Sequence, residues 1–377
     1  MHLFTCTTTA VMLASAAAQS LGDRLAKHGS TSMLHGLLVD LKLINTFEKA
    51  QNSTLLAMTD DAIIYLAKWG LNLTSMDPDI ARGILQYHFL EGSYISSAPA
   101  LHTETQLARS SLKPSSGLTN ISKGAVVKLT ATYDGSHSLR VESGDQKIIH
   151  TIDTDIPYAN GVIHTINQGL VLPRSLSETS SLGELDGFWN TVTQSRMDGE
   201  LERLRDVTVF LPSNKAVWRG HSKLKSLNTK ALETLIKDHV VPNHVLFHTC
   251  FPQEPRMVTT LSGKKISISG DSKGRIFVNQ KMVTMQNVLI SGGGAHVVDE
   301  LLLPETDPGY DSSPSTTGAP WGLREDIARA VVGLTVISGV FIIGVIKAVR
   351  WRAAKRKAFL HYEPLPTTPS VVWVVPK

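Results

Sequence analysis

Cysteine is nearly absent from this chain of 377 residues, which contains only two. A disulfide framework, which small secreted domains use in place of a large core, is therefore excluded. Cys6 falls in a predicted leader, so the mature chain keeps Cys250 alone, either as a half-buried apolar residue or as part of an intermolecular bridge. The formal net charge of +4 is small, and its excess lies near the C-terminus, so we expect no nucleic-acid partner.

The motifs of common enzyme classes are missing as well. The sequence has no G-x-S-x-G elbow, no P-loop, no dinucleotide fingerprint and no H-E-x-x-H zinc site. The histidines lack the clustered spacing of metal ligands, so we expect no metal and no cofactor. The glycines 292–294 join two strand-like segments instead of opening a helix, and we interpret them as a tight turn. We therefore predict no enzymatic activity.

What the sequence does contain is an internal repeat. The segment GVIHTINQGLVLP, residues 161–173, is matched by GGAHVVDELLLP, residues 293–304. Each has a leading glycine, a histidine between apolar residues and a leucine-rich run that ends at proline. Two earlier pairs of segments recur in the same order: 53–64 with 207–218, and 84–95 with 235–246. Motifs that recur in order at similar spacings indicate a duplicated domain.

These motifs carry a family resemblance. The pattern TVFLPSNKAVW, the histidine motif YHFLEGSY and the two closing segments resemble the fasciclin, or FAS1, domain. The resemblance implies two copies of the domain, at residues 31–173 and 174–304. In its architecture the chain looks most similar to fungal proteins with tandem FAS1 domains and one membrane span. It implies an α+β fold in which a β-sandwich or wedge carries packed helices. It also implies adhesion outside cells and no enzymatic activity.

Four histidines stand at matching places in the two copies: His88, His164, His239 and His296. In some fasciclin domains a Tyr-His pair is linked to integrin-dependent adhesion, and Tyr87 and His88 match that pair, whereas the second copy has Asp238 before its histidine. The residues themselves favour histidines that are buried and hydrogen-bonded within the fold. Another hypothesis for these histidines is a hydrolase or transferase that uses histidine-bearing clefts.

Local patterns predict the same order of elements in each copy. Apolar residues at three- and four-residue steps over 33–50 predict a helical segment. Thr59 and Ser213 follow short strands, and we expect their side-chain oxygens to accept hydrogen bonds from the next helix. Residues 125–143 and 264–280 alternate apolar and polar positions around glycine turns and predict β-hairpins.

Two apolar segments lie outside the repeats. Residues 1–18 end in small residues and predict a signal peptide. Residues 327–349 suit a transmembrane helix, since about 20 apolar residues cross ~30 Å of hydrocarbon. The alternative is a buried helix of a soluble domain. Basic residues crowd its C-terminal side, and the positive-inside tendency then predicts a type I protein with both repeats outside the cytosol.

The regions beside the predicted span have their own signals. Residues 305–326 are rich in Pro, Ser and Thr and predict a stalk. The basic tail 350–377 is predicted to be cytosolic, where its charges can meet anionic lipids of the bilayer. In this tail Tyr362 and Leu365 match a tyrosine-based signal for an endosomal sorting adaptor.

Three N-x-S/T triplets predict glycosylation on exposed loops of the first copy: Asn52, Asn72 and Asn120. Together the signals predict a membrane-anchored, glycosylated adhesion protein whose paired domains bind a protein or a wall or matrix glycan. It would stand at the cell surface. The alternative is a vacuolar or endosomal protein that the tail signal delivers.

Overall fold

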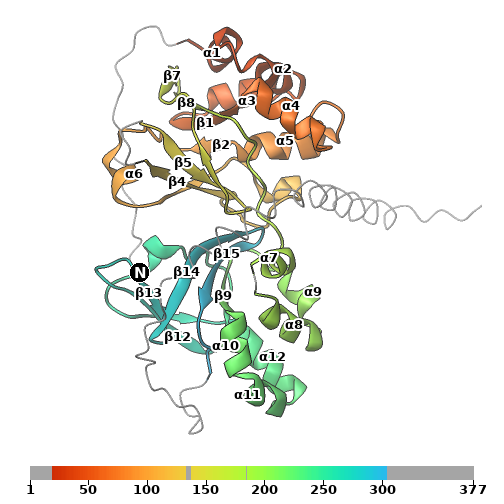
Figure 1. The fold of residues 1–377 in the computed structure, drawn as a ribbon, viewed down its shortest axis with the longest axis vertical. Coiled ribbons are helices and arrows are strands. Elements are labelled where there is room, and N and C mark those ends of the chain that lie inside the picture. Colours follow the sequence, from red (N-terminus) through yellow and green to blue (C-terminus); the bar gives the residue numbers. More distant parts are fainter. Residues whose placement is uncertain (1–18, 133–136, 184, 304–377) are drawn as a thin grey trace, which may run out of the picture. The chain divides into compact units, whose positions relative to one another are not determined.

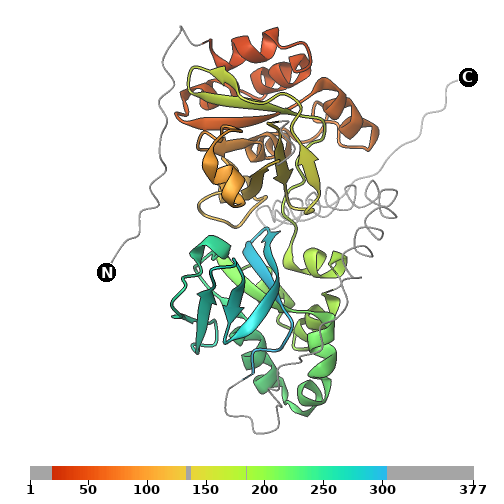
Figure 2. The same ribbon diagram turned by 60° about the vertical axis from the view of Figure 1, so that its left-hand side comes forward.

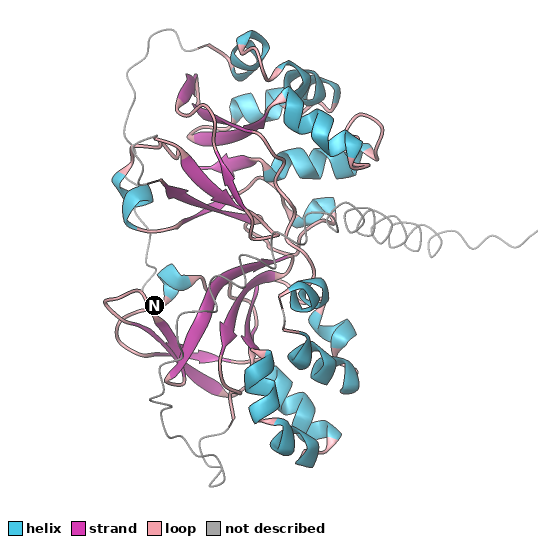
Figure 3. Cartoon of the chain, viewed as in Figure 1, coloured by secondary structure: helices cyan, strands magenta, loops and turns pink. Residues whose placement is uncertain are grey.

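The computed structural model describes residues 19–132, 137–183 and 185–303. Figure 1 labels the helices and strands of two α+β domains, and Figure 2 shows the same ribbon turned by 60°. Within each domain most of the helices gather on one side of the strands, whereas α6 (Pro99–Thr103) of the first domain lies apart from the others (Figure 3). The predicted signal peptide, stalk, transmembrane helix and tail lie outside the described residues. Among the described helices, none is long and apolar enough to cross a membrane.

The first domain contains two sheets and one large hydrophobic core. One sheet has the order β2-β1-β8-β7: Phe89–Glu91, Ser53–Met58, Gly161–Ile166 and Ile156–Tyr158. The other has the order β3-β4-β5-β6: Gln106–Arg109, Val126–Ala131, Leu139–Glu142 and Ile148–His150. The helices are α1 Leu21–Lys27, α2 Ser32–Asp40, α3 Ile44–Lys49, α4 Asp60–Lys68, α5 Pro78–Tyr87, α6 Pro99–Thr103 and the 3-10 turn Pro114–Ser116.

The second domain has one continuous sheet with the order β10-β9-β15-β14-β13-β12-β11. Its strands are β9 Val207–Pro212, β10 Val240–Val241, β11 Arg256–Thr259, β12 Lys265–Gly270, β13 Ile276–Val278, β14 Lys281–Ile290 and β15 Gly293–Val298. Its helices are α7 Leu176–Leu182, α8 Asp186–Gln194, α9 Asp198–Leu201, α10 Asn214–Arg219, α11 His221–Ser226, α12 Thr229–Asp238 and the 3-10 turn His248–Cys250. Two clusters of buried apolar side chains form its core.

The closing motif of each repeat forms the strand that pairs in parallel with the first strand of the same domain. Ser53 in β1 faces Gly161 in β8, and Val207 in β9 faces Gly293 in β15. A Cβ atom on Gly161 would lie 1.9 Å from the Ser53 carbonyl oxygen, and one on Gly293 would lie 1.9 Å from the Val207 carbonyl oxygen. Only glycine permits this approach, which explains why both motifs begin with it.

The predicted helical segment over residues 33–50 is divided in the structure. Helix α2 ends at Asp40 and α3 begins at Ile44. Between them Lys42 adopts a left-handed conformation with φ of 58°, and the Leu43 N–H donates to the Leu38 carbonyl oxygen at 2.8 Å. The apolar spacing continued across the break because both helices contribute side chains to the same core.

The other local predictions are confirmed. The Ser213 hydroxyl accepts a hydrogen bond from the Ala216 N–H at 3.1 Å, and Thr59 accepts one from Ala62 at 3.3 Å. Strands β4 and β5 pair antiparallel, as do β12 and β13, so both predicted hairpins form.

Candidate functional site

The histidine of the second motif braces the fold at the same place in both domains. The ring of His88 donates from Nδ1 to the Ile84 carbonyl oxygen at 2.8 Å, and its Nε2 accepts from the Leu170 N–H at 2.9 Å. In the second domain His239 does the same with Leu235 at 2.9 Å and Leu302 at 3.0 Å. Each ring therefore ties the end of a helix to the segment that follows the last strand.

The histidine of the closing motif forms a second brace. The ring of His164 contacts the Tyr94 carbonyl oxygen through Nε2 at 2.8 Å, and its Nδ1 accepts from the Asp155 N–H at 3.2 Å. His296 repeats this with the Leu246 carbonyl oxygen at 2.7 Å and the Asn287 N–H at 3.4 Å. Both ring nitrogens of each histidine have a main-chain partner, so none offers a nitrogen to a substrate.

Burial keeps these four rings neutral. Loss of solvent lowers the pKa of His88, His239 and His296 from 6.5 to about 4. Burial also lowers the pKa of His164. A neutral ring has one donor and one acceptor nitrogen, which is the pattern that the main-chain contacts require. The expectation of buried, hydrogen-bonded histidines is confirmed.

The predicted adhesion pair, Tyr87 and His88, lies in the core of the first domain. The two side chains are 0% and 2% exposed, and the Tyr87 hydroxyl donates to the Val126 carbonyl oxygen at 2.8 Å. Burial raises the pKa of this phenol above its usual value. In the folded domain neither side chain is open to a partner, so any effect of the pair on adhesion would act through the fold.

Asp238, which stands where the first domain has Tyr87, is also buried. Its side chain pairs with the Lys264 ammonium at 2.7 Å and accepts a hydrogen bond from the Ser262 hydroxyl. The Asp238 side chain is 6% exposed. A buried charge needs such partners because an uncompensated one is strongly destabilising. The second domain thus has, in place of a buried phenol, a buried carboxylate paired with a lysine whose side chain is 48% exposed.

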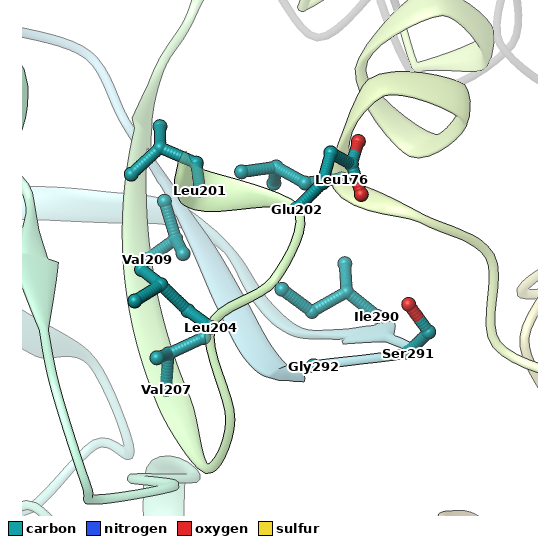
Figure 4. Close-up of a pocket in the computed structure, with 9 residues that line it drawn as sticks. All are labelled: Leu176, Leu201, Glu202, Leu204, Val207, Val209, Ile290, Ser291 and Gly292. Carbon is teal, nitrogen blue, oxygen red and sulfur yellow. The ribbon is translucent and has the colours of Figure 1, made fainter. Parts of the chain in front are cut away.

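A pocket in the second domain is too small for an organic substrate. Figure 4 shows its lining, which is aliphatic except for Glu202 and Ser291. Its empty volume is about 290 Å³, which includes open solvent, and so lies below the roughly 300–1,000 Å³ of typical ligand sites. One Glu202 oxygen already accepts the Ser177 N–H at 2.8 Å. In the described parts of the chain, no group of three or more His, Cys, Asp or Glu side chains is placed to hold a metal ion.

The three predicted glycosylation sites differ in accessibility. Asn52 and Asn72 are exposed. The Asn72 Oδ1 atom accepts from both the N–H and the hydroxyl of Thr74, at 3.0 and 2.7 Å. The side-chain oxygen of Asn72 is thus held by Thr74, the residue that completes its triplet.

Asn120 is partly buried by contacts with residues of the second repeat. Its N–H donates to the Ser291 carbonyl oxygen at 2.7 Å, and its Nδ2 donates to the Leu204 carbonyl oxygen at 3.4 Å. The N–H of Ser122, which completes the triplet, donates to the Asp206 carboxylate at 2.8 Å. A glycan on Asn120 would have to displace the contact with Leu204.

The remaining predictions concern Cys250 and the sorting signal of the tail. Cys250 is exposed at the end of a 3-10 turn, so the prediction of a half-buried residue was wrong. The mixed apolar run before it misled because Leu246, Phe247 and Phe251, not the cysteine, supply the buried side chains there. Tyr362 and Leu365 lie outside the described residues, and the sorting signal stays a prediction.

Sequence reasoning missed the main-chain partners of the histidines. Ile84 and Leu235 lie four residues before their histidines, a spacing that a helix end makes natural, and this signal was available. Leu170 and Leu302, by contrast, lie 82 and 63 residues away, and no local pattern marks them.

Comparison with known proteins agrees with this geometry. The Fasciclin domain family matches the chain twice, over residues 29–173 and 183–304. The chain is 37% identical over 309 residues to the fasciclin-like arabinogalactan protein CTB11 of Cercospora beticola, covering 81% of this chain and 82% of that one. It is 31% identical over 297 residues to the fasciclin-like arabinogalactan protein elcF of Phaeosphaeria nodorum, covering 79% and 92%.

A solved structure of a FAS1 domain pair from the insect cell adhesion molecule Fasciclin I also matches. It is 17% identical, with a TM-score of 0.36, and the match covers 74% of this chain and 99% of that one. The family matches span both repeats that the closing motifs revealed, and the two fungal relatives extend over most of the chain. The chain belongs to the fasciclin domain family, with two copies of the domain in tandem.

Proposed function

We propose that the protein is a membrane-anchored adhesion or interaction protein whose two fasciclin domains bind a protein or a wall or matrix glycan outside the cytosol. The observation that carries the proposal is the burial of the motif histidines and of Tyr87 and Asp238 beside them. Because these side chains serve the core, what remains for function is the outer surface of the two domains. Weak contacts on such surfaces gain from display of many copies on one membrane.

Enzymatic activity has little support in the described residues. A general base must reach the proton that it removes, at about 2.6–3.2 Å or through one water. The histidines that the hydrolase hypothesis would use have both ring nitrogens bonded to the main chain, and they are 0–2% exposed. The names of the two fungal relatives contain arabinogalactan, a polysaccharide, and this supports a glycan as ligand or as attached group.

Anchoring rests on the apolar segment 327–349 and its basic C-terminal flank. A second candidate is residence in the vacuole or endosome, which the Tyr362 signal favours. Both place the fasciclin domains on the same side of a membrane, and they differ in which membrane.

Protease shaving of intact cells separates the two candidates. The full chain, with a tag at its C-terminus, is expressed, treated with protease and blotted for the tag. We expect loss of most of the mass and a small tagged stub, because the cytosolic tail and the span are protected. Protection of the whole chain until the cells are permeabilised would favour the vacuole or endosome. A tag that is lost from intact cells would contradict the type I orientation.

A further inference from the structure

A basic face with one tryptophan lies on α10 and α11 of the second domain. Trp218 is 78% exposed, the largest value among the large apolar side chains of the described residues. Lys215 precedes Trp218 and Arg219 by three and four positions, so the three side chains share one face of α10. Residues 214–232 contain no Asp or Glu. Their basic side chains are Lys215, Arg219, Lys223, Lys225 and Lys230.

We call this surface the Trp218 face and define it by Lys215, Trp218 and Arg219 of α10; Lys223 and Lys225 lie on the neighbouring helix α11. Figure 1 shows α10 and α11 next to each other, with α12 beside them. No other large apolar side chain of these three helices is strongly exposed. A protein interface has a core of several apolar side chains, whereas a single exposed tryptophan beside basic side chains suits the boundary between water and lipid.

The described chain ends beside the Trp218 face. Arg219 donates a hydrogen bond to the Asp299 carbonyl oxygen, and a Cβ on Gly220 would lie 2.2 Å from the Leu301 side chain. The described residues end at Leu303, and residues 304–326 separate it from the predicted span. Even fully extended, a segment of this length reaches at most about 80 Å. A membrane entered at residue 327 therefore lies within a limited distance of this face.

We propose that the Trp218 face docks on the headgroup region of the membrane in which the chain is anchored. The proposal rests on the anchoring proposed above. The amphipathic indole ring enters the boundary between headgroups and acyl chains, and the lysine and arginine side chains meet lipid phosphates of the leaflet on the non-cytosolic side. The short linker keeps the face at a high effective concentration near the bilayer, so weak contacts suffice. Anionic lipid strengthens the contact and salt weakens it.

The test uses the full chain reconstituted in phosphatidylcholine vesicles with or without phosphatidylserine. Cys6 and Cys250 are replaced by serine, and Ser222→Cys, an exposed position in α11, carries a fluorescent dye. Quenching of the dye by acrylamide in the aqueous phase measures its exposure, and carbonate extraction measures anchoring separately. We expect severalfold less quenching with phosphatidylserine than without it, and recovery of quenching at high salt.

Matched variants assign the effect to the face. Trp218→Ser with Lys215→Gln is expected to abolish the protection. Met257→Ser with Lys265→Gln removes one exposed apolar side chain and one charge from strands β11 and β12 of the same domain, and should leave the protection intact. Unchanged thermal unfolding of both variants shows that the fold is kept.

Three outcomes would overturn the proposal. Equal quenching with and without phosphatidylserine, in a chain that resists carbonate, would refute docking and leave anchoring in place. A chain that carbonate extracts would refute anchoring and tethered docking together. Protection that arises only when a soluble acidic polysaccharide such as polygalacturonate is added would assign the face to a glycan.

Discussion

Acidification from pH 7 to pH 4 is expected to lower the free energy of unfolding of both domains steeply. Burial lowers the pKa of His88, His239 and His296 from 6.5 to about 4. Between these values the unfolded chain binds protons that the folded chain does not, so stability is complete above pH 6.5 and falls as the pH decreases. Each histidine contributes up to about 1.4 kcal/mol per pH unit, and the loss is complete below pH 4.

Urea unfolding at several pH values measures this loss. His239→Gln should destabilise the second domain at pH 7, because Leu235 and Leu302 lose a partner, and should flatten the pH dependence of that domain. His221→Gln is the control, since His221 is exposed on α11 and should change neither quantity. A free energy of unfolding that stays constant from pH 7 to pH 4.5 would contradict the conclusion that the buried histidines are neutral and stabilise the fold through their hydrogen bonds.

Replacement of the leading glycine of either closing motif is expected to unfold the domain that contains it. Gly161→Ala places a methyl group 1.9 Å from the Ser53 carbonyl oxygen, and Gly293→Ala does the same at Val207. Neither carbonyl can move without breaking the parallel pairing of β1 with β8 or of β9 with β15. We expect a loss of more than about 4 kcal/mol, the size of the largest single-residue effects.

Gly36→Ala is the matched control for this experiment. Gly36 lies in α2, and a Cβ there meets no atom within 4 Å. Alanine at a helical position should stabilise by up to about 1 kcal/mol relative to glycine. Calorimetry of the variants should show that Gly161→Ala affects one unfolding transition and Gly293→Ala the other. Equal, small effects of all three substitutions would show that the closing strands do not need this close approach.

The sequence revealed the duplication because FAS1 motifs combine local patterns with constraints that only one residue type satisfies. Gly161 and Gly293 mark the places where a strand approaches a carbonyl, and Ser213 marks a helix start. Such constraints are local, so they are visible without the fold. The break at Lys42 was missed because the apolar spacing on both sides serves one core.

The residues that could bind a partner could not be predicted from the sequence, because the exposure of a side chain depends on the fold. Tyr87 and His88 match an adhesion pair by residue type, yet the structure buries both side chains. Trp218 belongs to a motif that otherwise supplies core residues, and only the structure shows that its side chain faces solvent. A binding surface has no spacing rule, so the sequence indicates a class of protein and leaves the ligand to measurement.

Adhesion of cells that display the full chain tests the central claim most directly. Cells that express it are allowed to settle on surfaces coated with cell-wall glycan or with whole cells, and bound cells are counted after washing. We predict binding above that of cells without the protein, loss of binding when Gly161→Ala and Gly293→Ala disrupt both domains, and retention with Gly36→Ala. Binding that persists after both domains are disrupted would contradict the account.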